Sequence, residues 1–207
     1  MAFKGDLPPQ RNENVLQTHR LGNLTFEMIH QARSGDCVLI NYLNTQSLVG
    51  DGKISMSPRE LRDLVIEARV QNRESYADIA ENDTPLSLKD VVRLFPTILD
   101  VKAEQEDIVT VNGKVDQRTL QHNIEHDLLE YLDTYEHHLC TTGMGYHSRS
   151  IWKLGEDMYI VIDPTNANGF DQMSKSQLVI FLTNLCHNKK PDNNFFLFLR
   201  SKSEEKS

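Results

Sequence analysis

Four residues in this chain have side chains suited to nucleophilic chemistry: Gln31, Cys37, His147 and Asp163. Cys37 follows the tripeptide Ser-Gly-Asp, a break that predicts a helix starting at the cysteine with Asp36 as its N-cap. The helix dipole and the N–H groups of the first turn favour a thiolate at that position. A buried structural cysteine behind an ordinary helix cap fits the same residues, because free cysteine is among the most buried residue types.

A predicted β-hairpin supplies the histidine and the acid. The segments "GYHSRSIWKL" and "MYIVIDP" read as two strands, and a three-residue loop at 154–156 would place His147 directly opposite Asp163. Opposed residues have Cβ atoms about 5 Å apart, so the carboxylate would orient the imidazole and stabilise its protonated form. Each residue taken singly also fits a surface histidine or a turn carboxylate. One face of the hairpin is apolar and predicts a core (Trp152, Leu154, Met158, Ile160 and Ile162), while the His147 face, with Arg149, Lys153 and Tyr159, is expected beside a cleft.

Gln31 lies six residues before Cys37. A side-chain amide close to a nucleophile can donate a hydrogen bond to a developing oxyanion, together with the backbone N–H of the cysteine. A solvent-facing amide at the end of a short helix explains the glutamine equally well. In the catalytic interpretation Cys37 is the nucleophile, His147 the general base and acid, Asp163 the orienting carboxylate and Gln31 the oxyanion donor.

In chain order, these four residues resemble the site of papain-like cysteine hydrolases, in which the oxyanion Gln also lies six residues before a Cys that opens a helix. The set is most similar to the protease and deamidase effectors that bacterial pathogens inject into host cells. Their His and Asp lie on adjacent strands at about the separation found here between His147 and Asp163, sixteen residues. The resemblance covers 31–44 and 144–165, and departs from papain in lacking Cys-Gly-Ser-Cys-Trp and in having Asp instead of Asn.

That resemblance implies acyl transfer from an amide or ester to Cys37, followed by release to water or an amine, with no cofactor. Related triads occur in transglutaminases, arylamine acetyltransferases and deubiquitinases. The reaction is therefore open between peptide-bond cleavage, deamidation, ubiquitin removal and acyl transfer. The implied substrate is a protein, which for an injected effector would be a host protein.

The scaffold expected for these residues is α+β and papain-like: an N-terminal helical part, with the nucleophile at a helix N-terminus, packed on a C-terminal antiparallel sheet. Hydrophobic periodicity and capping residues predict helices at 23–31, from 37, at 57–72, from 87 and at 118–136, and a short strand and turn within 107–120. After residue 144 the pattern changes to strands, with one covering helix capped by Ser174 and Gln177 and a closing strand at "NNFFLFLR".

The 207 residues are expected to form a flexible arm at 1–14, a single papain-like catalytic domain at 15–200 and a disordered polar tail at 201–207. The net charge, 22 − 30 = −8, argues against a nucleic-acid partner. No apolar run reaches the length of a membrane span, and the N-terminus lacks the apolar core of a signal peptide. The three cysteines, Cys37, Cys140 and Cys186, have no paired spacing and are expected to be reduced.

The resemblance implies synthesis in a bacterial cytoplasm followed by secretion into the cytosol of a host cell. The tail "RSKSEEKS", with Glu204 and Glu205, is similar to the glutamate-rich C-terminal signals of type IV secreted effectors. A solvated, frayed terminus explains the same tail.

Two other functions remain open. The string His122-Asn-Ile-Glu125-His126 matches the pattern of inverted zinc peptidases, with two imidazoles as zinc ligands and Glu as base. Such a site needs a third ligand, which the spacing would place in the tail. The second alternative is a non-enzymatic protein-interaction module in which the triad never assembles. If the protein is a cysteine hydrolase, we expect its site to use no metal ion.

Overall fold

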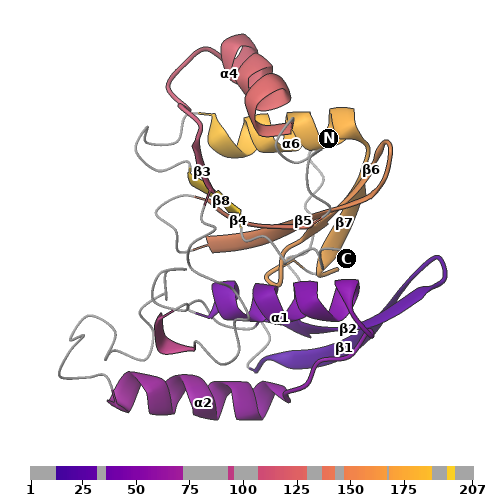
Figure 1. Cartoon of the computed structure of the whole chain (residues 1–207), viewed down its shortest axis with the longest axis vertical. Helices are drawn as coiled ribbons and strands as arrows, with labels where there is room; N and C mark the ends of the chain where they lie inside the picture. The colour runs from indigo at the N-terminus through magenta and orange to yellow at the C-terminus, as the bar shows by residue number, and fades with distance from the viewer. Residues whose placement is uncertain are drawn as a thin grey trace, which may run out of the picture.

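The computed structural model describes residues 13–31, 36–71, 93–95, 107–129, 137–142, 147–166, 168–187 and 195–198; the side chains at 49, 107–110, 128, 137–142, 147 and 195–198 are not part of that description. The described residues form a mixed α+β structure. Its layers follow one another from α4 and α6, through a central antiparallel sheet, to α1 with the β1–β2 hairpin, and then to α2 (Figure 1).

The central sheet has four strands in the order β4-β5-β6-β7, all antiparallel. Two further sheets have two strands each, β1 with β2 and β3 with β8, and β4 lies next to β8. The strands are β1 (Val15–Leu21), β2 (Leu24–His30), β3 (Asp107–Thr110), β4 (His137–Thr142), β5 (His147–Gly155), β6 (Met158–Ile162), β7 (Phe170–Met173) and β8 (Phe195–Phe198). The helices are α1 (Cys37–Val49), α2 (Pro58–Gln71), α4 (Gln117–Asn123), its π-helical continuation η3 (Ile124–Leu128) and α6 (Lys175–Cys186).

Both faces of the central sheet are buried. Ile160 and Ile162 on β6 pack with Phe26, Met28 and Leu48 on the side of α1 and β2. The alternate residues of the same strand, Tyr159 and Val161, pack on the side of α6 and α4 with a second group (Leu120, Ile124, Leu178, Val179 and Leu182). A strand covered on both faces reads as a continuous apolar run, which "MYIVI" is.

The predicted apolar face of the β5–β6 hairpin is confirmed for Trp152, Leu154, Ile160 and Ile162, which share one core. Met158, at the hairpin end, is 37 % exposed. The expectation that Tyr159 faces a cleft is wrong, because its ring is fully buried in the second core.

Local signals define α1 and α2 as predicted. Helix α1 begins at Cys37 with Asp36 in the N-cap position, although the Asp36 side chain makes no capping hydrogen bond. Helix α2 begins with a capping box: Ser57 Oγ accepts from Glu60 N at 3.2 Å, and a Glu60 carboxylate oxygen accepts from Ser57 N at 2.8 Å. Helix α6 has the same device, formed by Ser174 and Gln177 as predicted.

The predicted helix at 23–31 is wrong, because this segment is β2 of an antiparallel hairpin with β1. Leu21 pairs with Leu24 across a two-residue turn in which Gly22 has φ +59°, a conformation that glycine adopts without a Cβ penalty. Phe26, Met28 and His30 alternate along β2 and are all buried. That two-residue period, together with the Gly-Asn turn, is a hairpin signal.

Other predicted elements lie partly beyond the described residues. The helix predicted at 118–136 is present as α4 and η3, with Asp116 as N-cap accepting from Arg118 N and Thr119 N, and residues 130–136 are outside the description. The helix expected from residue 87 is described only at 93–94, which are helical. The arm at 1–14, except its last two residues, and the tail at 201–207 are outside it too.

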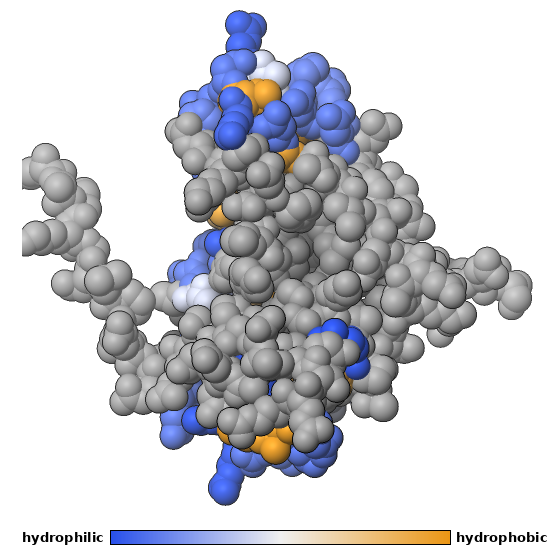
Figure 2. Space-filling view, turned by 90° about the vertical axis from the view of Figure 1, so that its left-hand side faces the viewer, coloured by the Kyte–Doolittle hydropathy of each residue, from blue (hydrophilic) through white to orange (hydrophobic). Residues whose placement is uncertain are grey.

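The surface of the described part is mainly hydrophilic around α4 and α2 (Figure 2). Helix α2 also carries two exposed apolar side chains, Ile66 and Val70. Among the described helices, none has the length and hydrophobicity that crossing a bilayer requires.

Candidate functional site

Cys37 opens α1 and is 3 % exposed. The neighbouring Asp36 carboxylate lies 3.6 Å from Nη2 of Arg69, an arginine of α2 that is itself 2 % exposed. Burial raises the pKa of the Asp36 carboxyl group, and the charge and hydrogen bond of Arg69, with a smaller effect of Arg62, oppose that rise. The N-terminus of α1 is therefore closely packed against α2.

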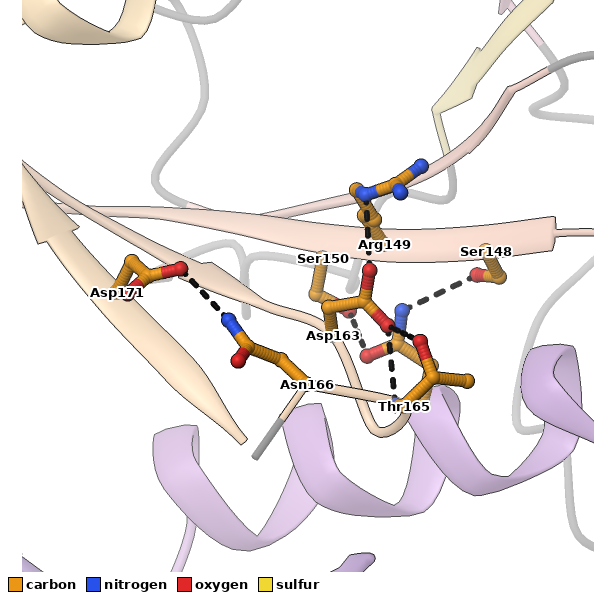
Figure 3. Close-up of polar contacts among 8 residues, drawn as sticks. Ser148, Arg149, Ser150, Asp163, Thr165, Asn166 and Asp171 are labelled. Carbon is orange, nitrogen blue, oxygen red and sulfur yellow. Dashed lines mark hydrogen bonds and ion pairs between the residues drawn. The ribbon is translucent and has the colours of Figure 1, made fainter. Parts of the chain in front are cut away.

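Helix α1 is joined to strand β5 by a buried polar cluster. Asn41 Nδ2 donates to Ser148 Oγ at 3.2 Å, and Asn41 Oδ1 accepts from Ser150 Oγ at 3.0 Å. Thr45, one turn further along α1, also bonds Ser150 Oγ and donates to the Asn41 carbonyl at 2.8 Å. Both serines lie on the side of β5 that faces α1 (Figure 3).

A second asparagine joins α1 to strand β2. Asn44 Oδ1 accepts from Ile29 N at 2.7 Å, and Asn44 Nδ2 donates to Ile29 O at 3.0 Å. The side-chain amide thus occupies the place that a further strand would take beside β2. Two residues beyond Ile29 is Gln31, which is 8 % exposed and whose backbone N–H donates to Pro164 O at 2.8 Å. The end of β2 is therefore held between α1 and the loop that follows Asp163.

Asp163 stands at the exit of β6 and is held from two sides (Figure 3). Its Oδ2 forms an ion pair with Arg149 Nε at 3.0 Å. Its Oδ1 accepts from the backbone N of Thr165 at 3.0 Å and from Thr165 Oγ1 at 2.6 Å. Asp163 N also donates to Gly169 O at 2.9 Å, so the carboxylate sits on a tightly bonded turn.

The predicted pairing of His147 with Asp163 is wrong by two residues. Ser150 pairs with Ile162, so the next position along the ladder sets Arg149 opposite Asp163. The loop is shorter than the predicted one, because Gly155 pairs with Met158 and the register shifts between Lys153 and Gly155. A two-residue displacement leaves each side chain on its predicted face, which is why the apolar pattern alone did not reveal it.

His147 is the first residue of β5, immediately before Ser148, and its backbone pairs with Thr142 of β4. The position of its imidazole lies outside the described side chains. Of the four predicted residues, the structure thus gives side-chain surroundings for Gln31, Cys37 and Asp163 and a backbone position for His147.

Sequence reasoning missed Asn41, Asn44 and Arg149. A signal for the two asparagines was present, because they are the only polar residues in "CVLINYLN" and lie three positions apart, on one face of the helix. Two polar side chains on one face of an otherwise apolar helix indicate specific buried partners. Arg149 was placed on the His147 face of the hairpin, and its ion pair with Asp163 was not predicted.

The rival zinc site has two neighbouring imidazoles, since the ring centroids of His122 and His126 lie 4.2 Å apart. Both side chains are exposed. Within the described residues, no group of three His, Cys, Asp or Glu side chains is arranged to hold a metal ion. The third ligand expected from the tail falls outside those residues.

Comparisons of the chain with protein-family models, with curated proteins and with solved structures find no match. The site is therefore described by the geometry of its own residues. The helix that opens with Cys37 is bonded through side chains to β5 and to β2. The end of β2 is bonded in turn to the loop after Asp163.

Proposed function

We propose that this protein is a cysteine-dependent hydrolase of the protease or deamidase type, with a papain-like arrangement of its site, acting on a protein substrate. Cys37 is the nucleophile, His147 the general base and acid, Asp163 the carboxylate that orients the imidazole, and Gln31 an oxyanion donor. The resemblance to injected bacterial effectors makes a host protein the substrate class to test first.

The observation that carries the proposal is the contact between Asn41 and Ser148. Asn41 bonds Ser148 and Ser150, and Thr45 bonds Ser150, so α1 and β5 run in the same direction. One helical turn back from Asn41 is Cys37, a step of about 6 Å. One residue back from Ser148 is His147, a step of about 3.4 Å. Both steps lead to the same end of the two elements.

The proposed reaction begins with attack of the Cys37 thiolate on the carbonyl carbon of a substrate amide. The carbonyl oxygen becomes an oxyanion beside the Cys37 N–H and the Gln31 amide. His147 gives its proton to the leaving nitrogen, which departs as an amine or ammonia, and an acyl-thioester remains on Cys37. Water then loses a proton to His147 and attacks the thioester, which releases a carboxylic acid and restores the thiol.

Asp163 can orient His147 while paired with Arg149, because an ionised carboxylate has about four lone-pair sites for hydrogen-bond donors. The ion pair with Arg149 and the bonds from Thr165 fix the carboxylate in place. Such support from surrounding groups keeps a catalytic carboxylate in one geometry.

The direct test compares host-cell lysate treated with the intact protein and with the Cys37→Ala variant, followed by mass spectrometry of the lysate proteins. A mass gain of about one dalton on a Gln or Asn side chain identifies deamidation, and new chain ends identify proteolysis. A lysate that is the same after both treatments contradicts the proposal.

The alternative function is a non-enzymatic interaction module. Its supporting observation is that Asp163 already has a structural role, with both of its carboxylate oxygens bonded by Arg149 and Thr165. A thiol-reactive probe separates the two functions, because an activated Cys37 reacts rapidly near neutral pH and an inert buried one does not.

A further inference from the structure

We propose that Asn41 is a positioning residue that sets the separation between Cys37 and the first residue of β5, a role that rests on the proposed function. Asn41 does not contact the reacting atoms in that mechanism. It acts by fixing how far α1 lies along β5.

The side chain of Asn41 is fully buried and so are both of its serine partners. Its amide nitrogen is bonded to Ser148 and its amide oxygen to Ser150, two residues that lie on the same face of β5. Thr45 adds a third bond from the same helix to Ser150. A buried amide bonded through both of its ends has one favourable position along the strand, because hydrogen bonds weaken steeply when their distance or angle changes.

Packing alone would not fix this position. The residues around Asn41 in the first half of α1 are apolar and buried, with Val38, Leu39, Ile40 and Leu43 at most 5 % exposed. Apolar surfaces tolerate rearrangement and give little directional preference, since the hydrophobic effect is non-directional. A single polar residue in an apolar seam is the best-attested way of specifying register. Asn41 has this place between α1 and β5, and Thr45 supports it one helical turn further along.

The position of Asn41 along the helix links this register to the site. Cys37 and Asn41 are four residues apart and lie on one face of α1, one above the other. On the strand, Ser148 is adjacent to His147. Any sliding of α1 along β5 therefore changes the distance between the thiol and the start of β5 directly, with no flexible segment between them.

The experiment measures the alkylation rate of Cys37 by iodoacetamide at pH 6 and pH 9, by mass spectrometry of the peptide that contains Cys37. An ordinary thiol with a pKa of about 8.5 reacts roughly 200-fold more slowly at pH 6, because little thiolate is present. In the intact protein, a thiolate paired with imidazolium is expected to keep the two rates within about tenfold. Asn41→Ala is expected to lower the pH 6 to pH 9 ratio by at least about tenfold, because the pair is no longer held together.

A second variant separates positioning from stability. Asn41→Leu combined with Ser148→Ala and Ser150→Ala removes the polar groups of the cluster together, which largely restores stability because few buried groups are left unsatisfied. The reactivity ratio is expected to stay low in this variant. The matched control is Thr183→Val, which deletes a buried hydroxyl that donates to Val179 O at 2.7 Å on α6, across the sheet. It should lower stability and leave the ratio unchanged.

The outcomes are distinct. If the intact protein behaves as an ordinary thiol, or does not react, the proposed function itself fails. If the intact protein is reactive at pH 6 and Asn41→Ala or the triple variant keeps that reactivity, the hydrolase proposal stands and the positioning role of Asn41 is refuted. If Thr183→Val lowers the ratio as much as Asn41→Ala does, the effect is one of general stability and the positioning role is again refuted.

Discussion

Asn44 provides the most quantitative test of how α1 is held. Its side chain is fully buried, and its amide bonds both the N–H and the C=O of Ile29 at 2.7 and 3.0 Å. Asn44→Ala removes both bonds and leaves two buried backbone groups without these partners. Each such group costs about 1–3 kcal/mol, so the free energy of unfolding should fall by about 2–6 kcal/mol. Against a typical total of about 5–15 kcal/mol, that is a large fraction.

Urea unfolding followed by fluorescence measures this loss, since Trp152 is the single tryptophan and packs partly buried in the same core as Phe26 and Met28. With a urea dependence of roughly 2–3 kcal/mol per molar, the midpoint should fall by roughly 0.7–3 M. The control is Asn112→Ala, whose exposed side chain accepts from Lys114 N at 3.0 Å. A surface change of this kind should cost about 0.5 kcal/mol or less.

The Asn44→Asp variant tests the same bonds through pH. The new carboxyl group would accept from Ile29 N but could donate to Ile29 O only when protonated. Burial and this second bond would both raise its pKa in the folded state above the unfolded value. The variant's stability relative to the original protein should therefore be highest at low pH and fall as pH rises through the raised pKa. A loss under about 1 kcal/mol for Asn44→Ala, or a pH-independent penalty for Asn44→Asp, would refute the reasoning.

Three further substitutions test the scaffold around the site. Gly169→Ala should cost about 1–3 kcal/mol of strain at φ +77° and so lower the melting temperature, and its added Cβ would lie 2.7 Å from Cε1 of buried His30. An unchanged melting temperature would contradict this close packing. The hydrogen bond from Ile54 N, and next Lys53, lower the pKa of the Glu27 carboxyl group. Glu27→Gln should therefore reduce stability at pH 7, and this loss should shrink as pH falls through the lowered pKa. Equal losses at pH 7 and pH 3 in chemical denaturation would be inconsistent with that cause. Ser174→Ala should cost about 1 kcal/mol in a urea titration by removing half of the α6 capping box, and a neutral result would mean that the cap does not stabilise the helix.

The starts of three helices could be predicted because their signals are local. The Ser57–Glu60 box and the Ser174–Gln177 box each act within a few residues at the start of a helix. Asp36 marks the start of α1 by its position alone, without a capping hydrogen bond. The strands β5 and β6 were equally readable from their composition and turn residues. Such features depend on the backbone of a single segment, so no knowledge of distant contacts is needed.

The β1–β2 hairpin shows where local reading was insufficient. The segment 23–31 has apolar residues that fit a short helix. The structure instead packs Phe26 and Met28 of β2 in one core and Ile29 in the core with α1 and α2, and Asn44 bonds the outer edge of the strand. A strand edge that finds a buried partner is stabilised by contacts that an isolated helix of this length would lack, because short helices are marginal on their own.

The sequence by itself determined the α+β class, the helix that opens with Cys37 and the strand pair that carries Asp163. Only the tertiary structure decided the register of that strand pair, in which Arg149 and not His147 faces Asp163. It also decided the partners of the two asparagines of α1. Those partners lie as much as 109 residues away, as Ser150 does from Asn41. The physical reason is that caps and periodicity are settled within one segment, whereas register and buried hydrogen bonds are settled by which segments exclude water from one another.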